Sequence, residues 1–173
     1  MESDSYNQQQ LEDLLFEVLE AEAGDAKTIQ HLIKVHSFAK IIGVGEGMDD
    51  ASLQTLEAAS YLHNIGVKPA EEKYGSSSGE LQEQEGPILA QGILSELGFD
   101  NYIIERVCYL IGHHRTFESI DGDDFQAFVE AEYLTIAYEK DYDREELADV
   151  YHRYFRTETG KRLFRQIYGI TEE

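Results

Sequence analysis

The stretch AASYLHNIGVK (residues 58–68) places a histidine and an asparagine at a point where a helical pattern ends. The residues before His63 suit a helix, and a glycine three positions after it breaks the pattern. An asparagine shortly before a glycine is a common helix terminus, so Asn64 has an ordinary structural explanation. A metal-binding or proton-transferring histidine would normally have a carboxylate beside it. Alone, the stretch therefore fits a helix end and a functional pair about equally.

Apolar residues recur at helical spacing through most of the chain, and it contains two prolines. The pattern predicts an all-α fold of about seven helices in a single domain spanning residues 1–173. We expect these helices near residues 8–23, 25–42, 49–63, 86–97, 99–114, 125–138 and 144–168. Residues 67–84 are the longest irregular stretch in this interpretation, and its length favours a functional loop or lid over a simple connection. A floppy surface loop is the alternative.

The chain is strongly acidic, because its 14 Lys and Arg residues are outnumbered by 35 Asp and Glu residues, for a formal net charge of −21. Such a surface repels phosphate backbones and anionic membranes, so we expect neither a nucleic-acid polymer nor a membrane as partner. A small phosphorylated substrate or ligand stays compatible with this charge if local cations or a metal ion attract it. A homodimer is a further candidate assembly.

The single cysteine, Cys108, lies in an apolar run, and we interpret it as a core residue. A chain without a disulfide framework fits a reducing compartment. No apolar run approaches the length of a membrane span. These observations favour a cytoplasmic location.

Five of the six histidines fall into three groups on three predicted helices, which are His31 with His36, His63, and His113 with His114. His31 extends an apolar helix face, where a histidine is more often a hydrogen-bonded core residue than a ligand, and we expect His36 to be exposed. Glu132 lies among apolar residues, and a carboxylate is costly to bury unless it is paired or binds a cation. Histidines and a carboxylate from three helices would suit Mn, Fe, Ni or Zn.

Three segments in this order resemble the HD-domain superfamily of metal-dependent phosphohydrolases: His31-x-x-x-Val35, LHNIG at residues 62–66, and VEAEYL at residues 129–134. That family has the motif order H…HD…D on an all-helical bundle, and the usual second motif is LHDIG. The segments EQEGPILAQGILSELGF and VCYLIGHHRTF also look like those of bacterial members. The resemblance implies a motif-bearing core over about residues 25–140, on which the helices of about 143–168 pack.

The resemblance also implies roles for individual residues. His31 and His63 match the two histidine ligands of the metal, which in the family polarises a phosphoryl oxygen and generates hydroxide. Asn64 and Glu132 take the places of the two aspartates, as metal ligands. The further candidates are His113 and His114 for a second metal or a phosphate, and Lys68 and Arg115 for a phosphate. The implied catalytic residues are His63, Asn64, Lys68 and Arg115.

Both carboxylate positions depart from the family pattern. Glu132 keeps the charge of an aspartate and moves the oxygen outward by one methylene, whereas Asn64 offers only a neutral amide oxygen. By analogy with changes around metal sites, such a loss lowers metal affinity or activity about 10–100-fold. Three functions stay open: an active phosphohydrolase on a small phosphate ester or nucleotide, an inactive relative that binds a nucleotide or phosphorylated metabolite as a sensor or regulator, and a purely structural domain.

Overall fold

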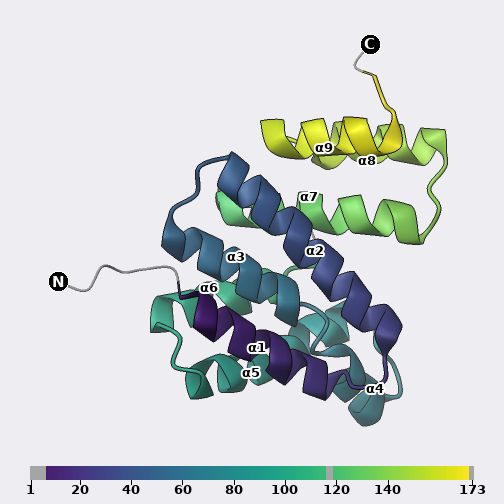
Figure 1. Cartoon of the computed structure of the whole chain (residues 1–173). Helices are drawn as coiled ribbons and strands as arrows, with labels where there is room; N and C mark the ends of the chain where they lie inside the picture. The colour runs from purple at the N-terminus through teal and green to yellow at the C-terminus, as the bar shows by residue number, and fades with distance from the viewer. Residues whose placement is uncertain (1–6, 116–118, 172–173) are drawn as a thin grey trace.

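The computed structural model describes residues 7–115 and 119–171 (Figure 1). Within these residues the chain forms nine α-helices and no strand. They are α1 (Gln8–Ala21), α2 (Ala26–Gly45), α3 (Asp50–Leu62), α4 (Val67–Tyr74), α5 (Gly79–Glu96), α6 (Asn101–Ile111), α7 (Gly122–Glu139), α8 (Arg144–Tyr154) and α9 (Glu158–Tyr168). The predicted all-α class is confirmed, and the predicted count of about seven helices is wrong.

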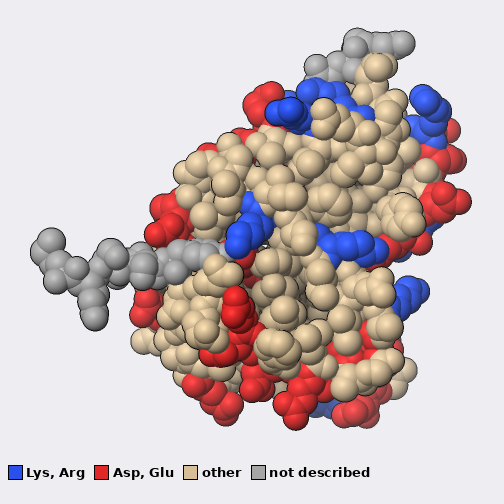
Figure 2. All heavy atoms as spheres, viewed as in Figure 1, with Lys and Arg blue, Asp and Glu red and all other residues tan. Residues whose placement is uncertain are grey.

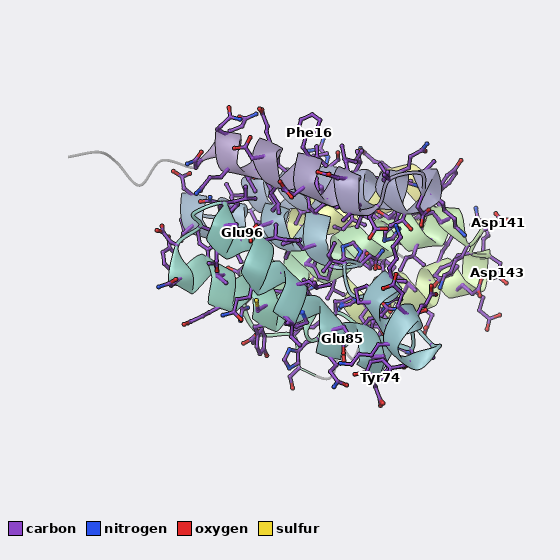
Figure 3. All side chains as sticks on the ribbon, turned by 90° about the horizontal axis from the view of Figure 1, so that it is seen from below. Phe16, Tyr74, Glu85, Glu96, Asp141 and Asp143 are labelled. Carbon is purple, nitrogen blue, oxygen red and sulfur yellow. The ribbon has the colours of Figure 1, made fainter. Side chains whose placement is uncertain are left out.

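One additional helix lies in residues 67–84, which the sequence pattern predicted to be irregular. This segment forms α4 and the first turn of α5, so it is not a long loop. The segment is so polar that its sequence lacks the regular apolar spacing that predicts a helix. Contacts between α4 and α5 stabilise it instead. The hydroxyl of Tyr74 and the ammonium of Lys73 donate to Glu85 at 2.8 and 3.0 Å, and Figure 3 shows Tyr74 beside Glu85.

The second additional helix arises because the predicted helix over residues 144–168 is broken between α8 and α9. The carboxylate of Glu130 on α7 is fully buried and accepts hydrogen bonds from the backbone N–H groups of Arg156 and Thr157 at 2.6 and 2.9 Å. These two N–H groups therefore bond to a side chain of another helix, where a continuous helix would bond them to its own carbonyls. Thr157 then caps α9 through its side chain.

Helix α2 runs through the middle of the bundle, with α3 on one side and α7 on the other (Figure 1). The largest side chains that the structure buries fully are Leu14, Ile42, Leu56, Leu62, Leu94, Ile103, Leu110, Ile111, Phe125, Phe128, Phe155 and Phe164. Each such burial contributes about 1.5–3 kcal/mol to stability. The last two helices pack on α7, and α9 also contacts α2. This core fixes α2, α3 and α7 relative to one another.

The surface carries the charge imbalance of the sequence. Acidic side chains lie around much of the edge of the face in Figure 2 and gather along its lower rim, while basic side chains form a few separate patches. None of the described helices is both long and apolar enough to cross a membrane.

Candidate metal centre

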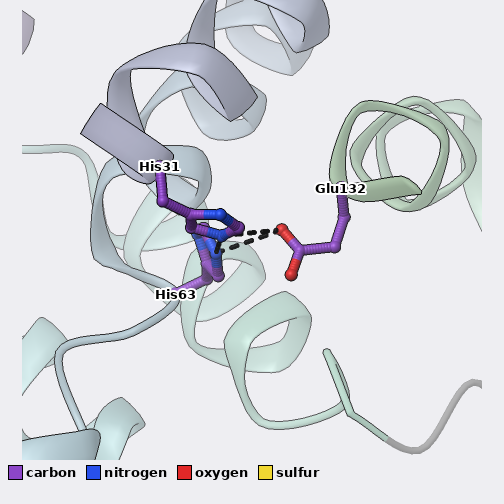
Figure 4. Close-up of side chains that lie close together, drawn as sticks. All are labelled: His31, His63 and Glu132. Carbon is purple, nitrogen blue, oxygen red and sulfur yellow. Dashed lines mark hydrogen bonds and ion pairs between the residues drawn. The ribbon is translucent and has the colours of Figure 1, made fainter. Parts of the chain in front are cut away.

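Three buried side chains from separate parts of the chain lie close together (Figure 4). His31 extends from α2, His63 directly follows α3, and Glu132 extends from α7. The Nε2 atoms of the two histidines lie 3.2 Å apart. Oε2 of Glu132 lies 3.2 Å from Nε2 of His63 and 3.4 Å from Nε2 of His31. The structure thus brings together three of the residues that the sequence analysis named as metal ligands.

Local structure accounts for the position of each group. The Asp25 side chain caps α2 by accepting the Thr28 N–H, so His31 lies in the second turn on the face that also buries Leu32. The second half of α3 is buried along its whole length, and His63 ends this helix. Glu132 belongs to a buried run of α7 that begins at residue 127.

Hydrogen bonds on the far side of each ring determine which nitrogen faces the carboxylate. Nδ1 of His63 donates to the carbonyl of Ser60 at 2.8 Å, and Nδ1 of His31 donates to a carboxylate oxygen of Glu139 at 2.8 Å. We assign the Nδ1–H tautomer to both neutral rings from these contacts. Both Nε2 atoms then present a lone pair to Glu132, so three acceptors converge and need a cation or a proton between them.

The ionisation of the centre follows from the same contacts. Burial alone would raise the pKa of Glu132, but His63 and His31 outweigh it and hold the pKa well below the ordinary value. Burial alone would lower the pKa of His31, but Glu132 and Glu139 outweigh it and raise the pKa. The centre thus favours an ionised carboxylate beside a positive charge.

Among the described residues, three buried side-chain atoms accept or donate no hydrogen bond: Oδ1 of Asn64, Nε2 of His114 and Oε2 of Glu132. Asn64 lines one cavity with Glu132, and His114 lines an adjoining cavity with the same residue. A buried polar group without a partner costs about 1–3 kcal/mol, so three such atoms in residues that line two adjoining cavities point to a ligand or ion that satisfies them.

His114 is another imidazole whose Nε2 carries a lone pair. Its Nδ1 donates to the carbonyl of Ile111 at 2.5 Å, and its ring meets that of His63 edge-on, with centroids 5.7 Å apart. Burial and the neighbouring His63 lower the pKa of His114 to about 3, so its ring is neutral. His114 lies beside the three-residue centre and is not part of the group whose ligand atoms converge.

The centre opens into a cavity of about 310 Å³. It is lined by Asp25, Lys27, Thr28, His31, Asn64, Arg115, Glu132, Ile136, Glu139 and Lys140. An adjoining cavity of about 180 Å³ shares four of these residues and adds His114, Tyr133 and Tyr142. Arg115 lines both cavities, as the implied contact to a phosphate requires.

Two of the candidate residues lie elsewhere. The ammonium group of Lys68 pairs with Glu22 at 2.9 Å and donates to the carbonyl of Ala21, so it binds the end of α1 and does not line the cavity of the centre. His113 is exposed, stacks on Tyr109 and donates through Nδ1 to the carbonyl of that residue at 2.7 Å. Neither position fits the role that the resemblance implied.

Two other expectations need correction. His36, which we expected to be exposed, is only partly so: it pairs with the buried Glu57 at 2.8 Å and stacks on Tyr61. Cys108 is half-buried at the edge of the core, and burial raises the pKa of its thiol.

Sequence reasoning missed Glu139, Lys27 and Lys140. Glu139 lies seven residues after Glu132, and that spacing places both carboxylates on one face of a helix. This spacing is the signal that could have identified Glu139 as the partner of His31. Lys27 lies in the first turn of α2 and Lys140 directly follows α7, and no sequence motif includes either residue.

Comparison with known proteins supports the fold. The structure is similar to the crystal structure of a predicted HD superfamily hydrolase from an uncultured Thermotogales bacterium, with a TM-score of 0.64 and 24% sequence identity. The match covers 94% of this chain and 85% of the other. Neither a protein-family model nor a curated protein sequence matches the chain. The chain therefore has the HD-domain fold, and its donor set of two imidazoles and a carboxylate could hold a divalent metal ion.

Proposed function

We propose that this protein is a metal-dependent phosphohydrolase that acts on a small phosphate ester or nucleotide. The observation that carries the proposal is the convergence of three acceptor atoms, from His31, His63 and Glu132, beside an open cavity. The Thermotogales protein of the same fold is itself described as a predicted hydrolase, which agrees with this proposal.

The residues fit a divalent ion. His31, His63 and Glu132 would hold it, and the unsatisfied Oδ1 of Asn64 would add a neutral oxygen. Glu139 holds the ring of His31 so that Nε2 faces Glu132, from where it would bind the ion. When bound, such an ion polarises a phosphoryl oxygen and lowers the pKa of a coordinated water.

Arg115 supports the phosphate part of the proposal. Its guanidinium lines the cavity, and its Nε donates to Oε1 of Gln82 at 3.3 Å. Its backbone N–H donates to Glu83 at 2.9 Å, so both the backbone and the side chain are held in place. A planar guanidinium is well suited to bind two phosphate oxygens at once.

Metal analysis tests the proposal directly. Purified protein, and protein reloaded with Mn, Fe, Ni or Zn, should contain about one metal ion per chain and release phosphate from small phosphate esters or nucleotides. His31→Ala and His63→Ala should lose both properties, while His152→Ala, an exposed histidine on α8, should keep them. A chain that takes up none of the four metals contradicts the proposal.

A second candidate function is binding without turnover, as a sensor or regulator of a nucleotide or phosphorylated metabolite. Asn64 favours it, because an amide in place of a carboxylate weakens the hold on a divalent ion. In that case a ligand should raise the unfolding temperature and remain chemically unchanged. A purely structural domain would show neither response, and His63→Ala would change only its stability.

A further inference from the structure

Lysine side chains divide into two groups in this protein. Five of the seven, Lys34, Lys40, Lys68, Lys73 and Lys161, lie within 4.0 Å of a carboxylate oxygen. Within the described part of the chain, the ammonium groups of the other two, Lys27 and Lys140, make no ion pair or hydrogen bond. Both of these line the cavity of the metal centre. In a chain of net charge −21, two ammonium groups at one place that have no described carboxylate oxygen within 4.0 Å need an explanation.

None of the three carboxylates in the same cavity forms an ion pair with these lysines. Glu132 faces the two histidines, and Lys27 acts on Asp25 only as a charge at longer range, where it contributes to the lowered pKa of that residue. Asp25 accepts the N–H and the hydroxyl of Thr28 at 3.0 and 2.8 Å. Glu139 is bound by Lys34 at 2.7 Å and by His31 at 2.8 Å. The positive charges of Lys27 and Lys140 therefore stay available to an anion that enters from solvent.

The two lysines lie at a different depth from the metal centre. Lys27 precedes His31 by one turn of α2, about 6 Å along the helix, and Lys140 follows Glu132 by two turns, about 12 Å along α7. The bond between His31 and Glu139 holds these helix ends together. Both lysines are exposed, whereas His31 and Glu132 are buried. The cavity thus has a metal-ligating floor and a cationic mouth.

We propose that Lys27 and Lys140 form a second anion subsite at this mouth, so that the ligand is an organic diphosphate and not a monophosphate. The proposal rests on the proposed function, which places one phosphate at the metal centre and Arg115. The adjoining cavity, lined by Tyr133 and Tyr142, gives space to the organic group, and the unsatisfied Nε2 of His114 would accept a hydrogen bond from it.

A pair of nucleotides isolates the contribution of the second phosphate. AMP and its α,β-methylene diphosphate analogue share the nucleoside and differ by one phosphonate group, and the analogue resists cleavage between its phosphorus atoms. Their Kd values are measured by calorimetry on the full chain, supplied with the metal ion that it retains best. The wild type should bind the diphosphate about tenfold more tightly, as expected for two exposed charge contacts. This preference should weaken with added salt.

The double variant Lys27→Gln/Lys140→Gln should bind the two nucleotides with nearly equal Kd values and keep the metal content and the AMP affinity of the wild type. Lys161→Gln is the matched control, because its ammonium group lies on α9 beside Glu158, and it should keep the tenfold preference. Circular dichroism confirms that the helices of each variant are intact.

Two results overturn the subsite. One is a wild type that binds neither nucleotide or binds both equally, and the other is a double variant that keeps the wild-type preference. The proposed hydrolase fails by a different measurement, which is the absence of bound metal and of phosphate release. A lysine-dependent diphosphate preference in a protein that takes up no metal would therefore support the subsite and contradict the hydrolase.

Discussion

Nδ1 of His31 on α2 donates a hydrogen bond to the carboxylate of Glu139 on α7 at 2.8 Å, and this contact determines which ring nitrogen of His31 is directed at Glu132. Without Glu139 the ring is free to adopt the other tautomer, or to rotate away from the centre. We expect Glu139→Ala to lower metal affinity about 10–100-fold, as is typical when a residue that orients a ligand is lost. Competition with a chromophoric chelator measures the affinity. Glu145→Ala, at an exposed position of α8, is the control, and equal affinities would contradict the role of Glu139.

Replacement of Asn64 by aspartate should strengthen the centre. A charged oxygen in place of the unsatisfied amide oxygen should raise metal affinity about 10–100-fold. Without metal, the same change places a second carboxylate near the buried Glu132, so the metal-free variant should unfold at a lower temperature than the wild type. If neither metal content nor hydrolysis rises in Asn64→Asp, Asn64 does not weaken the centre.

Two glycines inside helices differ in the space around them, so replacement by alanine should change the stability of the protein in opposite directions. A methyl group at Gly160 would collide with the Glu130 carboxylate, which is held by the backbone of residues 156 and 157. Gly160→Ala should therefore lower the free energy of unfolding by about 1–3 kcal/mol. Gly92 in α5 has open space around it, so Gly92→Ala should be neutral or raise it by up to about 1 kcal/mol. Chemical denaturation measures both, and a Gly160→Ala protein as stable as the wild type would show that Glu130 moves freely.

The contacts of Lys73 and Tyr74 on α4 with Glu85 on α5 predict that the stability of the fold depends on pH. The hydroxyl of Tyr74 and the ammonium of Lys73 hold the pKa of Glu85 below its ordinary value of 4.5. Since the pKa is lowered in the folded state, the carboxylate stabilises the fold above pH 4.5, and this contribution disappears as the pH falls through the lowered pKa. Glu85→Gln should therefore unfold at a lower temperature than the wild type at pH 7, and the difference should shrink by pH 3. A difference that is constant over this range would exclude the ionised carboxylate as its source.

Motif order in the sequence was enough to identify the residues that meet at the centre, because His31, His63 and Glu132 each lie on a clearly periodic helix. Proximity along the chain was a poor guide to Lys68. It follows the second motif by only a few residues, but α4 directs its ammonium group to Glu22 at the C-terminal end of α1. The short distance along the sequence predicted that Lys68 lies near the site. The direction of α4 places its ammonium group away from the cavity instead.

The break between α8 and α9 could not be predicted from its own residues. It depends on Glu130, a carboxylate on another helix that becomes a partner for this turn only when α7 and α9 pack together. Helix α4 was missed for a similar reason, since its polar residues gain their stabilising contacts from α5. In both cases a long-range contact between polar groups outweighs the local pattern.

The three groups of the metal centre come from α2, α3 and α7, which are separate stretches of the chain. A cation held there would act as a cross-link among three helices that the unfolded chain lacks, so binding would stabilise the folded state by mass action. Occupancy would then be visible as a rise in the unfolding temperature with metal concentration. Thermal unfolding can therefore show whether the metal centre is occupied even when no substrate has been identified.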